Sequence, residues 1–308
     1  MKKLLHALCL VILVFSLLLT ISSCEEETVI QHVSEGDSVL YLLGNTSGSQ
    51  MMGFVLKTKN NNTIVIDGGT EANAEYLEDF ISEKSDDHVD AWFFTHPHHD
   101  HIGAFNEIFS ESSSISVDKI YHHFPSMNEL MEHGYRKETE KELWESTEKI
   151  FDEKFSSKVE KIHTEDVFVI DNIKITVLRV YDPMMTTDFV NNSSVVYRIE
   201  NENKSFLILG DLGVLGGEEL IKNCPPELLH TDYTQMAHHG QGGVSKEFYE
   251  HIEPKRCIWP TPPWLWNNDA GEGFDTGPWQ TVRTREWMDE LGITEHYVAK
   301  DGTIAIHF

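Results

Sequence analysis

The stretch THPHHDHIG, residues 95–103, constrains this chain more than any other part of the sequence. It places four histidines and one aspartate within six positions, directly after the apolar run VDAWFF at residues 89–94. Imidazole and carboxylate side chains are ligands for Zn²⁺, and also for iron or manganese. Side chains that diverge from one loop can reach two ions, so we expect His96 and His98 to bind one metal and Asp100 and His101 to bind a second.

Three other apolar strands end in residues of the same kind. Asp67 ends TIVID, Asp211 follows SFLILG, and His238 and His239 follow YTQMA. Side chains just beyond a strand lie in the loop layer, where active sites are built on rigid scaffolds. Asp211 alone could be a turn or helix cap, but beside the histidine loop we interpret it as a carboxylate that bridges two metals.

Apolar runs, turn residues and helical spacing indicate two strand-rich halves with helices between them. Two sheets packed together with helices outside would satisfy this pattern. Strands are predicted at 38–43, 53–58, 63–67, 89–94, 165–170, 173–181, 193–200, 204–209, 233–237 and 256–260, and helices at 71–84, 103–109, 218–223, 245–252 and 280–292. Residues 126–160 are charged and mostly helical, which indicates either a lid or a solvated helix that covers a sheet. Residues 296–308 are predicted to form a closing hairpin that turns at Asp301-Gly302.

The first 23 residues have the layout of a secretory signal, with Lys2 and Lys3 before an uncharged apolar run. Ile21-Ser22-Ser23-Cys24 resembles the lipobox of bacterial lipoproteins, in which the cysteine is lipidated. The alternative is an uncleaved amino-terminal anchor. Either predicts a protein outside the cytoplasmic membrane, and the lipobox predicts a lipid anchor. Residues 24–37 are expected to be an acidic tether, and residues 38–308 a single domain.

Charge and cysteine content argue against nucleic-acid binding and against a zinc-thiolate site. The formal net charge is −27, and nucleic-acid binding depends largely on phosphate neutralisation by Lys and Arg, so long nucleic acid is an unlikely partner. Cys224 and Cys257 could form one disulfide, but they do not have the spacing of a zinc-thiolate site.

The motifs together resemble the metallo-β-lactamase superfamily. Asp67-Gly68-Gly69, the His96–His101 motif, Gly210-Asp211 and His238-His239-Gly240 occur in the order of that family. The sequences NNSSVVYRI, AHHG and KDGTIAIHF are similar to the extracytoplasmic hydrolase domain of the DNA-uptake competence protein, and the His-His-Gly turn also occurs in teichoic-acid phosphorylcholine esterase. The resemblance covers roughly residues 38 to 308. It implies an α/β fold, a four-layer αββα sandwich.

The resemblance also implies roles for the motif residues. His96 and His98 would bind the first metal, Asp100 and His101 the second, and Asp211 both. His238 would complete the second site and His239 would face the substrate, although the reverse assignment stays open. Asp67 would hydrogen-bond a ligand histidine.

The sequence departs from many superfamily members between these motifs. VYDPMMTTDFVNNSS, residues 180–194, lacks the histidine that many members carry before the bridging aspartate, and Asn191 or Asn192 takes its approximate place. His122 and His123 could contribute a ligand instead, but they are more simply explained as a strand-end pair near the rim of a cleft.

These features predict an extracytoplasmic metal-dependent hydrolase with two divalent ions, zinc first and Mn²⁺ or Fe²⁺ as alternatives. Two bridged ions lower the pKa of a shared water toward about 7, so the expected nucleophile is hydroxide. Asp100 would orient it, and His239 would stabilise the oxyanion.

The expected substrate is a small-molecule or cell-wall phosphoester, most simply a phosphodiester. Trp264, Trp266 and Trp279 lie in the polar loop 260–279 and could stack on it or cage a quaternary ammonium, or could pack on one another. Two alternatives are a lactonase, esterase or β-lactamase acting on C–O or C–N bonds, and a non-catalytic binding lipoprotein.

Overall fold

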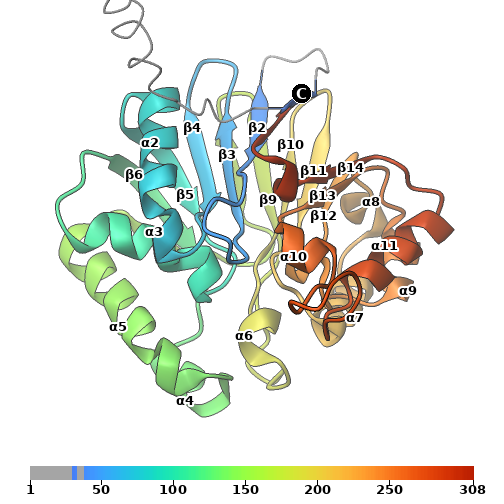
Figure 1. Ribbon diagram of the computed structural model, residues 1–308. Helices are drawn as coiled ribbons and strands as arrows, with labels where there is room; N and C mark the ends of the chain where they lie inside the picture. Colours follow the sequence, from blue (N-terminus) through green and yellow to red (C-terminus); the bar gives the residue numbers. More distant parts are fainter. Residues whose placement is uncertain (1–29, 33–37) are drawn as a thin grey trace, which may run out of the picture.

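The computed structural model describes residues 30–32 and 38–308, and it consists of two β-sheets packed face to face between two layers of helices (Figure 1). The first sheet contains, in spatial order, β1 (Ile30–His32), β15 (Ile304–His307), β2 (Val39–Leu42), β3 (Gly53–Lys57), β4 (Thr63–Asp67), β5 (His88–Phe93), β6 (Ser116–His122) and β7 (Val159–Lys161). The second contains β14 (His296–Val298), β13 (Cys257–Trp259), β12 (Tyr233–Gln235), β11 (Ser205–Ile208), β10 (Val196–Glu200), β9 (Ile173–Arg179) and β8 (Val167–Ile170). This is the αββα sandwich predicted from the sequence.

The helices cover the outer faces of both sheets. They are α2 (Ala74–Ser85), α3 (His99–Ser110), α4 (Met127–His133), α5 (Lys137–Lys154), α6 (Phe189–Asn192), α7 (Val214–Asn223), α8 (Pro226–Leu229), α9 (Lys246–Ile252), α10 (Pro263–Trp266) and α11 (Thr281–Glu290), with short 3₁₀ turns η1 (Glu71–Asn73), η2 (His238–Gly240) and η3 (Ala299–Asp301). Figure 1 shows α2, α3 and α5 on the side of the first sheet and α7, α9 and α11 on that of the second.

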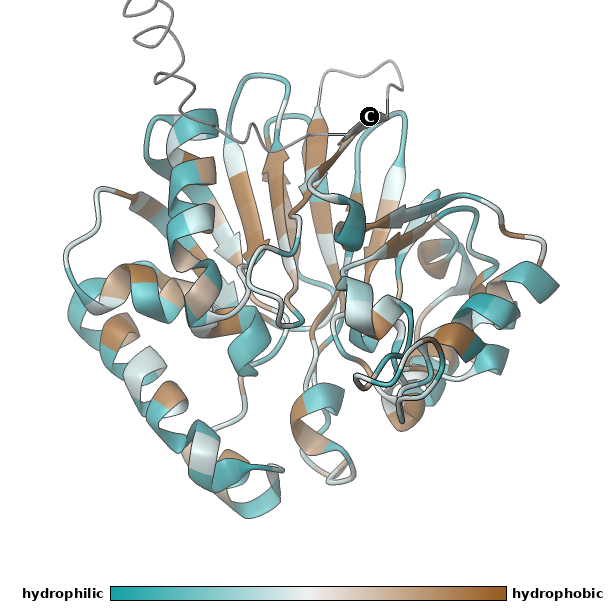
Figure 2. Cartoon of the chain, viewed as in Figure 1, coloured by the Kyte–Doolittle hydropathy of each residue, from teal (hydrophilic) through white to brown (hydrophobic). Residues whose placement is uncertain are grey.

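Three apolar clusters hold the layers together. One fills the space between the sheets, with Phe54 and Tyr197 among its members, and the other two lie between each sheet and its helices. Every residue of β3 and β4 is buried, because these strands are covered on both faces. Strands in that position read as continuous apolar runs rather than as an alternation. Figure 2 shows this pattern as brown strands inside and teal outward surfaces on the helices.

The predicted closing hairpin at residues 296–308 is wrong. β14 pairs with β13 in the second sheet, whereas β15 pairs with β2 and β1 in the first. Residues Ala299–Asp301 form η3, and Gly302 has a φ of 102°. The Asp-Gly sequence therefore marks a crossing from one sheet to the other rather than a two-residue turn.

Two predicted helices begin earlier than the apolar spacing indicated. The helix expected at 103–109 begins at His99, and that expected at 218–223 begins at Val214. His98 has extended backbone angles and precedes the first turn of α3, which contains Asp100. A carboxylate near a helix N-terminus is favoured by the partial positive charge there. Asp100 and His101 are therefore held on a helical turn rather than on a loop.

The amino-terminal part of the chain is described only at residues 30–32. These residues were predicted to belong to the acidic tether, but they form β1, parallel to β15. The predicted signal at residues 1–23 and the other tether residues lie outside the described part of the chain. Within residues 30–32 and 38–308, no helix is long and apolar enough to cross a membrane.

Residues 126–160 are mostly helical, as predicted, in α4 and α5, and β7 begins at Val159. α5 packs against α3 and buries Trp144, Thr147 and Phe151, while its opposite face carries exposed Glu138 and Glu142. The segment is thus a helix solvated on one side that covers α3 and the first sheet.

Candidate metal centre

The predicted site residues meet at one edge of the sandwich. β4 ends at Asp67, the loop after β5 leads into α3, and Asp211 and His238 follow β11 and β12. Two groups of possible ligand atoms lie there, each with all its atoms within 4.8 Å of one another, and both contain Asp211. A carboxylate shared between two ligand groups is an arrangement that suits a dinuclear site.

The first group consists of His96, His98 and Asp211. His96 Nε2 lies 3.0 Å from His98 Nδ1 and 3.7 Å from Asp211 Oδ2. His96 is fully buried, and the His98 side chain is 19% exposed. The two imidazoles therefore direct nitrogen atoms at one point beside the Asp211 carboxylate.

The second group consists of Asp100, His101, Asp211 and His239. His101 Nε2 lies 3.2 Å from Asp211 Oδ1, and His239 Nε2 lies 3.2 Å from Asp100 Oδ2 and 3.6 Å from Asp211 Oδ2. All four side chains are buried. Oxygen and nitrogen atoms of this kind at these separations can surround a divalent ion.

This grouping differs from the prediction, which gave the fourth place to His238. His238 Nε2 lies 3.7 Å from Asp211 Oδ2, and its side chain is 24% exposed. Both histidines have left-handed backbone angles, with φ of 51° and 53°, so the turn carries the second imidazole inward. The nitrogen His239 Nδ1 donates to Pro260 O at 2.7 Å, which holds the ring in this orientation.

Unpartnered buried atoms show that the centre fits a metal. In the described structure, His101 Nε2, His239 Nε2 and both carboxylate oxygens of Asp211 are buried without a hydrogen-bond partner. Buried polar groups are otherwise almost always hydrogen-bonded. The Nδ1–H groups of His101 and His239 are engaged with Asp67 and Pro260 O, so each Nε2 is left with a lone pair for an ion.

In the metal-free centre, burial and the attraction between histidines and carboxylates shift the pKa values of these side chains. Burial alone would lower the pKa of His101, but the Asp211 and Asp67 carboxylates raise it well above its ordinary value. Burial would raise the pKa of Asp211, but His101, His239 and His238 hold it well below its ordinary value. A bound metal ion would replace the proton as the positive charge between these groups.

The metal-free protein should be most stable near pH 6.5. The pKa values of His101 and His239 are raised in the folded protein. The stability that these protonated groups contribute is therefore complete below their unfolded pKa, about 6.5, and is lost as pH rises through their folded pKa values. On the acid side, burial lowers the pKa of His98 to about 4 and that of His122 to about 3. Their protonation in the unfolded state therefore destabilises the protein as pH falls from 6.5.

Thermal unfolding of metal-free and zinc-loaded protein between pH 5 and 9 would check this expectation. The alkaline loss of stability should be confined to the metal-free protein, because a bound ion needs His101 and His239 unprotonated. Equal alkaline losses in both forms would contradict it.

Asp67 holds His101 from behind, as expected. Asp67 Oδ2 accepts hydrogen bonds from His101 Nδ1 at 2.7 Å and from Thr95 Oγ1 at 2.7 Å, while Oδ1 accepts from Thr95 N at 2.8 Å. Asp67 itself has a φ of 54°, a conformation that Asp and Asn tolerate better than most residues. The contacts fix both the ring orientation and the tautomer of His101.

Replacing Asp67 with Asn should weaken metal binding by about 10–100-fold, the range typical for partners behind a ligand histidine. The size and backbone preference of the residue are kept, so the fold should survive. Zinc titration against a chromophoric chelator would measure the change, and unaltered affinity would contradict a role for Asp67 in orienting His101.

Asn191 and Asn192, the two asparagines near the site, have different partners. Asn191 lines the metal pocket, is 7% exposed, and has an Oδ1 atom without a partner in the described structure. Its Nδ2 donates to Asp188 Oδ1 at 3.0 Å. Asn192 Oδ1 instead accepts from Gly213 N and Gly216 N, each at 3.1 Å. Asn191 faces the site, whereas Asn192 braces the start of α7.

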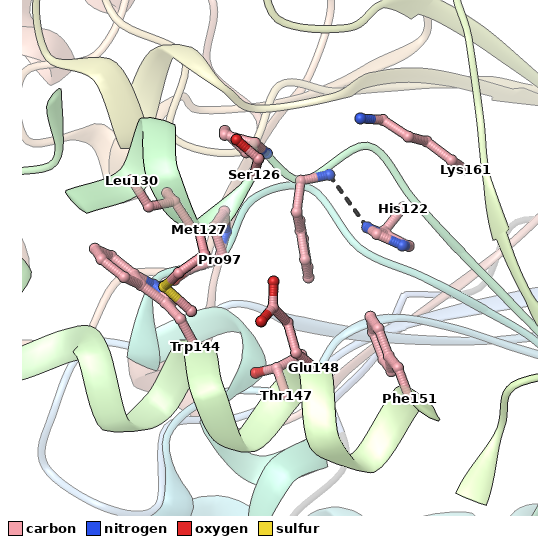
Figure 3. A pocket seen from close by; sticks show the side chains of 12 residues that line it. Pro97, His122, Ser126, Met127, Leu130, Trp144, Thr147, Glu148, Phe151 and Lys161 are labelled. Carbon is pink, nitrogen blue, oxygen red and sulfur yellow. Dashed lines mark hydrogen bonds between the residues drawn. The ribbon is translucent and has the colours of Figure 1, made fainter. Parts of the chain in front are cut away.

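His122 and His123 lie apart from the metal pocket, as the simpler interpretation predicted. His122 Nδ1 accepts from Phe124 N at 3.1 Å, and the ring packs on Phe151. It lines a separate cavity of about 200 Å³ between β6 and α5 (Figure 3). His123 is bonded to Ile162 O.

The metal pocket has a volume of about 460 Å³, and charged, polar and aromatic side chains line it. Trp264 and Trp279 line it and contact each other with ring centroids 4.7 Å apart. Trp266, grouped with them in the sequence prediction, instead packs on Trp259 and beneath Arg285. Aromatic walls are therefore present, built by two of the three predicted tryptophans.

Three pocket residues carry no sequence motif. Gln50 Nε2 donates to Asp100 Oδ2 at 2.6 Å, and Arg136 and Glu140 reach the pocket from the start of α5. Each belongs to a segment whose local pattern indicates only a loop or a solvated helix. Their proximity to the site arises from packing between segments far apart in sequence, which no local signal reports.

Comparison with known proteins agrees with this geometry. The family model of the metallo-beta-lactamase superfamily matches residues 50–252. ComE operon protein 3 of Bacillus subtilis (strain 168) is 26% identical over 182 residues, and the match covers 58% of this chain and about a fifth (21%) of that protein.

Solved structures show the same fold at low identity. The metallo-beta-lactamase fold protein YhfI from Bacillus subtilis is 13% identical with a TM-score of 0.51, covering 87% of this chain and 99% of that one. A mutant of the CmlA beta-hydroxylase is 12% identical with a TM-score of 0.52, covering 90% of this chain and 55% of that one. The chain therefore belongs to the metallo-β-lactamase superfamily and is a metal-dependent hydrolase with a candidate dinuclear centre.

Proposed function

We propose that the protein is an extracytoplasmic phosphodiesterase that uses two divalent metal ions, zinc in the first instance. The observation that carries this proposal is the pair of ligand groups joined by Asp211 in one pocket. Two ions held by a common carboxylate can bind two oxygens of one phosphoryl group, as two-metal phosphatases and nucleases do.

The ligand residues would divide between the two ions as the geometry groups them. His96, His98 and Asp211 would hold the first ion, and the second would take Asp100, His101, Asp211 and His239. When bound, the ions would lower the pKa of water and polarise the scissile bond. The choice of zinc is part of the proposal, because the donor atoms alone do not select it: they also suit Mn²⁺ and Fe²⁺.

Other residues of the chain would orient the reaction. Gln50 donates to Asp100 Oδ2 and accepts from Gln241 Nε2 at 2.7 Å, which holds the Asp100 carboxylate in one orientation. His238 lines the pocket and is partly exposed. We assign to it the role predicted for His239, a hydrogen-bond donor to the oxygen that gains charge in the transition state.

The pocket lining favours a phosphodiester with a flat or cyclic group. Arg136 lies at the rim, where its guanidinium can pair with the negative charge of a phosphodiester. Trp264 and Trp279 offer apolar ring faces for stacking. A small-molecule or cell-wall phosphoester fits these features, whereas the net charge of −27 opposes binding of long nucleic acid.

The proposed location rests on the amino-terminal sequence. The run from Lys2 to Cys24 has the parts of a lipoprotein signal, and a lipid anchor on Cys24 would hold the enzyme at the membrane surface. Growth with labelled palmitate, followed by mass analysis of a Cys24→Ala variant, would test this part separately.

Metal analysis together with substrate comparison tests the reaction. Purified protein should contain about two zinc equivalents per chain and should hydrolyse bis-p-nitrophenyl phosphate faster than a lactone or nitrocefin. Preferred turnover of the lactone or nitrocefin would replace the phosphodiesterase proposal with C–O or C–N hydrolysis. Absence of bound metal and of activity with added Zn²⁺ or Mn²⁺ would leave a binding protein.

A further inference from the structure

A buried carboxylate on α5 lies directly behind one of the candidate ligands. Glu140 is 7% exposed, and its Oε2 atom has no hydrogen-bond partner in the described part of the chain. Oε2 lies 3.8 Å from His98 Nε2. A buried carboxylate oxygen without a hydrogen-bond partner is costly to the fold, so its presence at this point needs a reason.

The orientation of His98 supplies that reason. His98 Nδ1 faces His96 Nε2 at 3.0 Å, so Nδ1 is the atom directed at the first metal position. Nε2 is on the other side of the ring and is directed at Glu140. A carboxylate behind a ligand imidazole keeps the proton on the distal nitrogen and increases the basicity of the nitrogen that binds metal.

α5 also contacts the preceding residue, Pro97, in the loop between β5 and α3. Trp144 lies one helical turn after Glu140, on the same face of the helix, and its Nε1 donates to Pro97 O at 2.8 Å. Figure 3 shows the Trp144 indole beside Pro97. Two successive turns of α5 therefore contact Pro97 and His98, the residues that set the geometry of the first ligand group.

We propose that Glu140 is a positioning residue for the first metal, which it stabilises through His98, and that the α4–α5 segment is thereby part of the metal centre. The inference rests on the proposed two-metal function. It predicts opposite effects on two measurable properties: loss of the carboxylate charge weakens metal binding, yet it removes an unpaired buried charge from the metal-free protein. A residue that only supported the fold would change both properties in the same direction.

The test compares Glu140→Ala and Glu140→Gln with Glu142→Gln, which removes the same charge from an exposed position on α5. Zinc affinities of both sites would be measured by chelator competition, and melting temperatures would be measured without metal. Glu140→Ala should weaken one of the two zinc equivalents by about 10–100-fold. Glu140→Gln, which keeps an oxygen dipole beside His98 Nε2 but no charge, should show a smaller loss and should melt no lower than the parent without metal. Glu142→Gln should match the parent in zinc affinity.

The outcomes separate this inference from the proposed function. Two tightly bound zinc ions in both the parent and Glu140→Ala would overturn the inference alone. Weaker zinc binding in Glu140→Gln accompanied by a lower metal-free melting temperature would also overturn it, because the effect would then be structural. A parent protein that binds neither zinc nor manganese, and has no activity with either, would overturn both.

Discussion

Replacing Asp211 with Asn should leave the protein without two tightly bound metals and lower kcat by about 10³-fold or more. Asp211 is the member common to both ligand groups, and its two oxygens face His101 on one side and His96, His238 and His239 on the other. An amide has one neutral oxygen, so it cannot supply a charged ligand to each ion. Since a metal ion contributes several kcal/mol to transition-state stabilisation, its loss has a rate effect of this size.

Metal content per chain and phosphodiester turnover would be measured together on the Asn variant. Asp152→Asn is a matched control, because Asp152 is an exposed aspartate on α5 that belongs to no group of possible metal ligands in the described residues. It should keep both metals and full activity. Far-ultraviolet circular dichroism would establish that the Asp211 variant is folded. Retention of two tightly bound equivalents by that folded variant would rule out a bridging role for Asp211.

The sequence could group most of the candidate ligands because they follow apolar strands directly. Asp67, His96 and Asp211 each lie within three residues of a strand end, and strands that are buried on both faces are readable as continuous apolar runs. The ends of such strands meet at one edge, so the sequence alone indicates which of their side chains lie together. The same runs indicated two packed sheets with helices outside, and the family resemblance implied the four-layer αββα sandwich.

The wrong hairpin, and the choice between His238 and His239 that the sequence left open, both depend on backbone conformation that a local pattern does not specify. Ala299–Gly302 has the composition of a hairpin turn, but it connects the two sheets, and only the pairing of β15 with β2 reveals this. At the second histidine motif, β12 ends at Gln235. Left-handed angles at His238 and His239 then invert the order in which the rings face inward. Strained backbone of this kind is concentrated at functional sites.

Residues brought in by tertiary packing could not be predicted at all. Gln50 lies in an irregular loop, and Glu140 looks like one more acidic residue of a solvated helix. Their importance depends on the contact of Gln50 with Asp100 and on the packing of α5 against α3. Neither the Gln50 contact nor the packing of α5 can be predicted from the periodicity of the segment that makes it.

The paired variants His239→Asn and His238→Asn should separate metal binding from substrate contact. Asn tolerates the left-handed backbone that both positions require, so the two changes impose similar strain. His239 Nε2 is buried, unpartnered and 3.2 Å from Asp100 Oδ2, and an amide oxygen is a poor replacement for an imidazole held by Pro260 O. His239→Asn should therefore retain one tightly bound metal instead of two, with kcat lowered by about 10³-fold.

His238→Asn should keep both metals, because His238 stands outside the second ligand group. Its kcat should fall by about 10²–10³-fold, the usual cost of removing one donor to a developing oxyanion. Metal content distinguishes the two variants even if their rates are similar. If His238→Asn lost a metal while His239→Asn kept two, the order first expected from the sequence would be correct, and the turn in solution would differ from the one that now directs His239 inward.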